Sequence, residues 1–178
     1  ALIPAMARVR FDGTSSLTAQ FVTAQGIGAV AGAFALPVLA ARFGRYRMLL
    51  VSLVLLPVAL VVYGLAPTAA AATAALVAVG ATYMFVFSGV GTVVQLRAPA
   101  ELRGRVLSFY FLALGVLYPI GALLQGPIAD RIGLGEMTVL SGLALFAVVV
   151  LLRFVRPARL AALDDPVAPA LVQGDLEG

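Results

Sequence analysis

The sequence contains no cysteine, no histidine and no lysine, and the first two absences exclude whole classes of chemistry. Without cysteine there is no disulfide and no reactive thiolate, and without histidine there is no imidazole to bind a metal. We therefore expect no metal and no cofactor. An enzyme needs a nucleophile, an acid–base pair or a metal site. A chain with these absences and only 8 acidic residues is not expected to be an enzyme.

Charged residues of either sign are scarce as well. They make up 11% of the 178 residues, while hydrophobic residues make up 62% and the mean hydropathy is +1.08. A soluble domain has about a quarter charged and about half apolar residues, so we interpret the chain as an integral protein of the cell membrane, with the lipid bilayer as its solvent. Its net charge of +4 does not indicate nucleic-acid binding, because the arginines lie between apolar runs and not on one solvated face.

Five apolar stretches are long enough to cross a bilayer, which takes about 20 residues of helix. Helices are expected because backbone groups in hydrocarbon must pair within their own segment. The predicted spans are approximately Leu17–Ala41, Met48–Leu65, Ala69–Leu96, Val106–Ala129 and Met137–Val155. The apolar start, ALIPAMARV, is interpreted as the end of a further helix whose beginning is missing. Residues 1–156 are thus predicted to form an all-α transmembrane bundle, and residues 157–178 a disordered cytoplasmic tail.

Arginine is distributed unequally between the two sides of the predicted membrane. Nine of the 12 arginines fall on one side, and Arg8, Arg10 and Arg131 fall on the other. Cytoplasmic loops carry the excess of basic residues in membrane proteins. We therefore expect the C-terminus to be cytoplasmic, on the same side as Arg42, Arg45, Arg47, Arg97, Arg103, Arg105, Arg153, Arg156 and Arg159.

The predicted spans differ in polarity. The second and fifth are almost uniformly aliphatic and are expected to face lipid, whereas the other three carry polar side chains on one helical face. These polar residues are expected to line a substrate cavity or, alternatively, to form hydrogen bonds between helices. The candidates are Thr18, Gln25, Ser88, Thr92, Gln95, Tyr118 and Gln125. Gly28 and Gly32 have the spacing of small residues that lets two helices pack closely.

Three local patterns resemble the C-terminal half of a major facilitator superfamily transporter, from the end of its seventh helix to its twelfth. The segment PVLAARFGRYR, residues 37–47, is similar to the signature loop G-x-x-x-D-R-x-G-R-[RK] between the eighth and ninth helices. Arg42, Gly44 and Arg45 match that loop. Ala41 replaces its aspartate, so the carboxylate of the usual charge relay is absent.

Two further segments carry the resemblance. The segment PAELRGRVLS, residues 99–108, is similar to the loop between the tenth and eleventh helices in the branch that exports drugs and siderophores. The segment GVLYPIGALLQGPIADRIG, residues 115–133, resembles the Gly-Pro-Gly antiporter motif, with Tyr118 in place of the glycine before Pro119. The order of the three patterns along the predicted spans supports the resemblance.

The resemblance implies a fold, a function and a partner. The fold is a polytopic membrane helix bundle, the C-terminal six-helix half of a transporter, and the partner is the missing N-terminal six-helix half. The function is secondary active export of hydrophobic or amphipathic small molecules by alternating access. A cytoplasmic gate is expected at the arginine loops, although topology alone also accounts for the arginines. Its candidates are Arg42, Gly44, Arg45, Glu101, Arg103 and Arg105. The alternative function is a non-transporting interaction or regulatory membrane protein.

Overall fold

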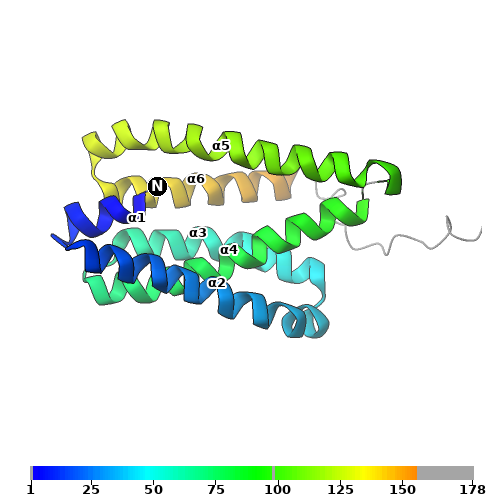
Figure 1. Ribbon diagram of the computed structural model, residues 1–178, viewed down its shortest axis with the longest axis horizontal. Coiled ribbons are helices and arrows are strands. Elements are labelled where there is room, and N and C mark those ends of the chain that lie inside the picture. Colours follow the sequence, from blue (N-terminus) through cyan, green and yellow to red (C-terminus); the bar gives the residue numbers. More distant parts are fainter. Residues whose placement is uncertain (1, 98, 156–178) are drawn as a thin grey trace, which may run out of the picture.

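The computed structural model describes residues 2–97 and 99–155, and these residues form an all-helical bundle (Figure 1). Five of the helices are long and apolar enough to cross a membrane, which confirms the predicted fold class. The predicted tail, residues 157–178, lies outside the described residues. The elements in chain order are α1 (Leu2–Ala5), the π-helix η1 (Met6–Arg10), α2 (Ser15–Phe43), α3 (Arg45–Leu65), α4 (Ala69–Arg97), the 3-10 helix η2 (Ala100–Leu102), α5 (Arg103–Ile132) and α6 (Leu134–Val155).

Single glycines form two of the turns between long helices. Gly44 separates α2 from α3 with a φ of 83°, and Gly133 separates α5 from α6 with a φ of 100°. Both values lie in a region that side chains disfavour, so glycine suits these positions. The Gly44 amide donates to the Ala40 carbonyl at 3.0 Å, which closes the last turn of α2. The helices extend beyond the predicted spans because backbone pairing continues through polar residues until such a turn.

Glycines also bring α2 and α4 into backbone contact. A Cβ on Gly28 would overlap the carbonyl oxygen of Val77, and a Cβ on Gly32 would lie 2.9 Å from the carbonyl oxygen of Ala81. On the facing helix, a Cβ on Gly80 would overlap the carbonyl oxygen of Gln25. The predicted packing role of Gly28 and Gly32 is therefore confirmed. Such close approach increases the van der Waals contact that holds helices together in lipid.

Glycines also allow α3 and α6 to pack closely. A Cβ on Gly142 would lie 3.0 Å from the carbonyl oxygen of Pro57, and one on Gly64 would lie 2.8 Å from Cγ2 of Val139. Because α3 also packs on α4, it lies between α4 and α6 in the middle of the bundle (Figure 1).

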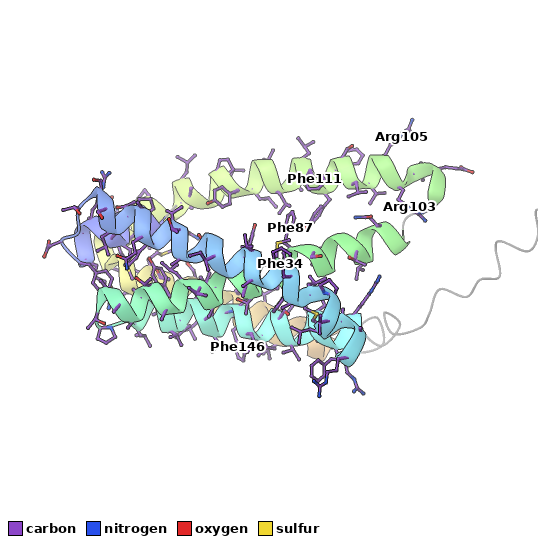
Figure 2. All side chains as sticks on the ribbon, turned by 60° about the horizontal axis from the view of Figure 1, so that its bottom comes forward. Phe34, Phe87, Arg103, Arg105, Phe111 and Phe146 are labelled. Atoms are coloured by element: carbon purple, nitrogen blue, oxygen red, sulfur yellow. The ribbon has the colours of Figure 1, made fainter. Side chains whose placement is uncertain are left out.

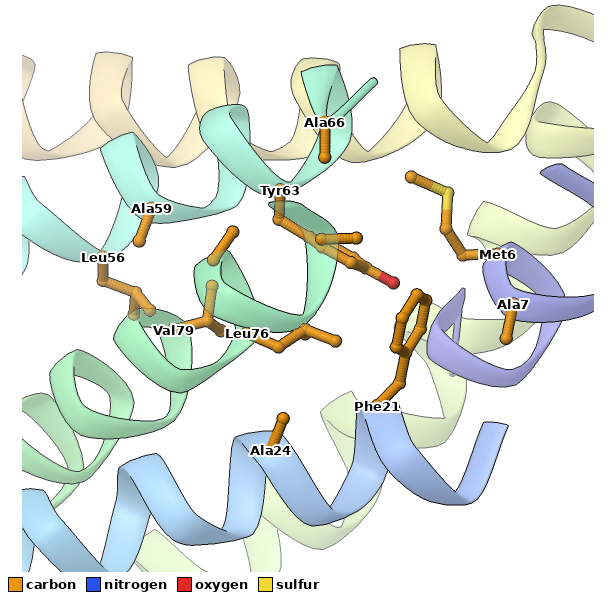
Figure 3. Close-up of a cluster of buried hydrophobic side chains, with 12 residues drawn as sticks. Met6, Ala7, Phe21, Ala24, Leu56, Ala59, Tyr63, Ala66, Leu76 and Val79 are labelled. Carbon is orange, nitrogen blue, oxygen red and sulfur yellow. The ribbon is translucent and has the colours of Figure 1, made fainter. Parts of the chain in front are cut away.

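The most buried side chains gather where η1 meets α2, α3 and α4 (Figure 3). Phe21 of α2 is fully buried and meets the ring of Tyr63 edge to face, with centroids 6.3 Å apart. Its other neighbour is Phe11, at 5.9 Å and also edge to face. Met6 of η1 completes this cluster, so the short first helices are packed into the bundle.

Burial within the described residues does not follow the polarity of the spans, and the prediction that α3 and α6 face lipid stays a prediction. The aliphatic α3 buries one face, which includes Leu49, Ser52 and Leu56, and exposes the opposite one. The more polar α5 has a single buried residue in the described structure, Ala129. The reason is that an aliphatic surface fits lipid and a neighbouring helix equally well, so polarity alone does not decide which one covers it.

Candidate functional site

The described arginines of the two predicted groups lie at opposite ends of the bundle. Arg103 and Arg105 begin α5 next to η2, at the end that also holds the α2–α3 turn with Arg42 and Arg45 (Figure 2). We call this the arginine-rich end. The other end holds η1, the Gly133 turn and the start of α6 (Figure 1). Among the described residues, Arg42, Arg45, Arg47, Arg103 and Arg105 lie at the arginine-rich end, and Arg8, Arg10 and Arg131 lie at the other, as predicted. Arg156 and Arg159 lie outside the described residues, and the assignment of the arginine-rich end to the cytoplasm stays a prediction.

The six predicted gating residues are all exposed at the arginine-rich end. The guanidinium of Arg42 lies 5.8 Å from the centre of the Phe43 ring. Gly44 provides the turn, and Arg45 begins α3. Within residues 2–97 and 99–155, no ion pair joins Glu101 to Arg103 or Arg105. These side chains are thus available to a partner surface, and their role in a gate stays a prediction.

A groove between α4 and α5 brings together three of the predicted cavity residues, Ser88, Thr92 and Gln95. They share one face of α4 because their spacing follows the helical period. The hydroxyl of Thr92 donates to the carbonyl of Ser88 at 2.9 Å, so its oxygen keeps acceptor capacity for a ligand. The groove has a volume of about 210 Å³ and is lined by Met84, Phe87, Ser88, Gly91, Thr92, Gln95, Leu107, Tyr110 and Phe111.

A row of aromatic rings crosses this groove. Tyr83 stacks on Phe87 with centroids 6.2 Å apart and an interplanar angle of 18°. Phe87 of α4 meets Tyr110 of α5 at 6.5 Å, and Tyr110 meets Phe111 at 5.5 Å. Figure 2 shows Phe87 and Phe111 on these two neighbouring helices. We call Tyr83, Phe87, Tyr110 and Phe111 the aromatic row.

The aromatic row is absent from the predicted cavity residues, because polarity and not ring stacking defines that set. A signal was present, since Tyr83 and Phe87 are separated by one helical turn and therefore share a face. Nothing in the sequence indicated that this face meets Tyr110, which follows the η2 loop.

The other four cavity candidates lie apart from the groove. Thr18 and Gln25 lie on α2, and the buried Oγ1 of Thr18 has no hydrogen-bond partner in the described part of the chain. Tyr118 is 70% exposed on α5, and Gln125 is half-buried on the same helix. The structure therefore unites the α4 candidates and leaves the α2 and α5 candidates at a distance, so the role of all seven as cavity lining stays a prediction.

The groove offers stacking surfaces and hydrogen-bond acceptors, and no acid–base pair. The described carboxylates are Asp12, Glu101, Asp130 and Glu136, and all four are exposed near helix ends. Among the described residues, no three potential metal ligands of the acidic, histidine or cysteine type gather at one place. The groove thus presents ring faces and hydroxyl and amide oxygens between α4 and α5.

Comparison with known proteins identifies the family. No curated protein and no solved structure matches the chain significantly. A family model described as transmembrane secretion effector, of the major facilitator superfamily, matches residues 1–172. The match covers every helix described above, and it agrees with the five membrane-length helices and with the loop pattern at residues 99–108. The chain therefore belongs to the transmembrane secretion effector family of the major facilitator superfamily, a family of membrane transporters.

Proposed function

We propose that the protein exports hydrophobic or amphipathic small molecules by secondary active transport. The observation that carries this proposal is the α4–α5 groove, in which aromatic rings and polar oxygens lie together between two membrane-length helices. Rings bind apolar surface and polar oxygens orient the polar part of a ligand, which is the usual division of work in small-molecule sites.

The groove is one wall of a larger site. Its volume of about 210 Å³ is smaller than the roughly 300–1,000 Å³ of sites that enclose a drug-sized ligand. The length of α5 is exposed, so a second surface has room to complete the site. We propose that this surface is a second six-helix half, because transporters of this kind bind substrate between two structural repeats near the membrane midplane.

The arginine-rich end supplies the gate in this proposal. Glu101 is exposed in η2, and Arg103 and Arg105 are exposed at the start of α5, so they can form and release ion pairs with the second half as the two halves rock. Alternating access needs contacts of this kind at one end of the molecule in one state and their loss in the other.

A matched pair of phenylalanines on α5 tests the proposed site. Phe111 lines the groove, whereas Phe109, two positions earlier, is 70% exposed and is not part of the groove lining. In the protein expressed from its complete gene, Phe111→Ala should lower the export of a fluorescent amphipathic dye. Contacts between aromatic rings contribute of the order of 1 kcal/mol. We therefore expect a severalfold loss of dye export with unchanged abundance of the protein in the membrane. Equal export by Phe111→Ala and Phe109→Ala would contradict the site.

A further inference from the structure

A second and larger cavity, of about 440 Å³, lies at the arginine-rich end between α2, α3 and α4. Its origin is the glycine contact described above. α2 and α4 touch at Gly28 and Gly80 and diverge from there toward their C-terminal ends, as Figure 1 shows. The first turns of α3 close one side of the resulting wedge. We call this space the wedge cavity.

The wedge cavity combines apolar walls with a cationic rim. Leu36 of α2, Leu49 of α3 and Phe85 of α4 belong to the walls. Arg45 and Tyr46, at the start of α3, also line it. Residues 13–100 contain no acidic residue, so no carboxylate on α2, α3 or α4 balances the charge of Arg45.

We propose that the wedge cavity binds one anionic phospholipid, with an acyl chain between the apolar walls and the phosphate at Arg45. The arginines flanking the turn, Arg42 and Arg47, are exposed and add to the positive potential there. Basic side chains beside the ends of membrane helices attract anionic lipid headgroups. The cavity volume falls in the range of about 300–1,000 Å³ found for sites that enclose a small ligand.

A lipid fits the wedge cavity better than a protein segment, because the cavity has apolar walls and an arginine at its edge. The cavity lies where the membrane-length helices α2 and α3 meet, and Arg45 at the start of α3 lines it. An occupant has to present an apolar chain and a negative group in this order, which is how a phospholipid is built. The proposal rests on the membrane-spanning helices alone and is independent of the proposed export function.

The wedge cavity shares a wall with the α4–α5 groove. Ser88 and Thr92 line both spaces. A bound acyl chain would keep α2 and α4 apart at this end and would thereby fix the side of α4 that faces the groove. The lipid would in this way be a structural ligand next to the transport site.

Native mass spectrometry of the purified protein expressed from its complete gene tests the headgroup contact. The probes are palmitoyl-oleoyl phosphatidylglycerol and the matching phosphatidylcholine, titrated separately. We expect the unaltered protein to retain one phosphatidylglycerol more tightly than phosphatidylcholine. Arg45→Gln should weaken phosphatidylglycerol about fivefold, the value for one arginine near an anionic surface. Arg131→Gln, at the opposite end, is the charge control and should bind as the unaltered protein does.

A second pair of variants tests the acyl-chain contact. Ala40 of α2 is half-buried in the cavity wall, so Ala40→Phe fills the space and should remove both lipids. Ala33 is exposed on the same helix and is not part of this wall, so Ala33→Phe should leave binding unchanged.

Cross-linking identifies where the lipid lies. Phosphatidylglycerol with a photoactivatable acyl chain should label peptides that contain residues 36–49 or 85–93. Equal lipid retention by Arg45→Gln, Ala40→Phe and their controls would overturn the proposal. Absence of label from these peptides, with label elsewhere, would also overturn it and would show that another part of the protein covers the cavity.

Discussion

Arg10 donates a hydrogen bond from Nη1 to the carbonyl oxygen of Gly64, 54 residues further along the chain. Its Nη2 donates to the carbonyl oxygen of Ala66 at 3.4 Å. Both acceptors lie at the C-terminal end of α3, where carbonyl groups have no helical donor and carry the negative end of the helix dipole. The same guanidinium occupies the space where a Cβ on Gly135 of α6 would be. Arg10 thus joins η1, α3 and α6.

Loss of this contact should destabilise the protein. Arg10→Gln removes a cation from two carbonyl groups, and hydrogen bonds of a charged donor contribute roughly 1–3 kcal/mol. We expect a lower midpoint of thermal unfolding for the purified protein. Arg8→Gln is the control, because Arg8 is an exposed arginine on the same short helix. Equal midpoints for both variants would show that the Arg10 contact does not stabilise the fold.

Substitution of Gly28 should disrupt the α2–α4 contact. A valine there would overlap the backbone of Val77 and force the two helices apart, and overpacking of this kind costs about 1–3 kcal/mol. The matched control is Gly26→Val, two residues earlier on α2, where no atom lies within 4 Å of the added Cβ. Size-exclusion chromatography of detergent extracts should show loss of folded protein for Gly28→Val alone. Similar profiles for the two variants would contradict the backbone contact.

Labelling of single cysteines should reveal the orientation. The sequence has no cysteine of its own, so each introduced thiol reports alone. The exposed positions Thr68, between α3 and α4, and Glu136, at the start of α6, lie at one end of the bundle, and Glu101, in η2, lies at the other. We expect a membrane-impermeant maleimide to label Thr68→Cys and Glu136→Cys on intact cells, and to label Glu101→Cys only after the cells are opened. Labelling of Glu101→Cys on intact cells would reverse the topology.

Arg103 should matter for transport more than for membrane insertion. Arg103→Gln removes one of nine arginines on the predicted cytoplasmic side, so the orientation should survive. If Arg103 forms a gate contact with a second half, export should fall severalfold at normal abundance. Export at the level of the unaltered protein would leave Arg103 with a topological role only.

Any carboxylate that couples transport to protons should lie outside residues 2–155. The four described carboxylates, Asp12, Glu101, Asp130 and Glu136, are exposed near helix ends, whereas a coupling group needs a place within the membrane. Proton-dependent export by the protein from the complete gene should therefore persist in Asp12→Asn, Glu101→Gln, Asp130→Asn and Glu136→Gln. Loss of proton dependence in Asp130→Asn, with substrate binding retained, would place the coupling site in this region.

The sequence predicted the helices because length and hydropathy determine them almost alone. Each predicted span lies within an observed helix, and the differences are at the ends: α3, α5 and α6 each begin three residues earlier than predicted, and α5 ends three residues later. Polar residues continue a helix past the apolar region, so hydropathy underestimates its length. The spacing of Gly28 and Gly32 also predicted close packing, although it did not identify Val77 as the neighbour.

Long-range neighbours were beyond prediction because they depend on how helices cross. Arg10 contacts the end of α3, and Tyr110 contacts Phe87. Both contacts depend on how two helices are rotated against each other, which no local sequence pattern indicates. The predicted cavity residues show the same limit. Those on α4 lie together because one helix carries them, whereas Gln25 and Tyr118 depend on the placement of two other helices.

The prolines of α5 determine where this helix can bend. The η2 loop fixes one end and the Gly133 turn fixes the other, while the aromatic row props the helix near Tyr110. Between the aromatic row and the buried Ala129, α5 contains two prolines, Pro119 and Pro127. Pro119 lies inside that stretch and interrupts the backbone hydrogen-bond ladder of the helix. We therefore expect α5 to bend most readily in the stretch that contains Pro119 and Pro127.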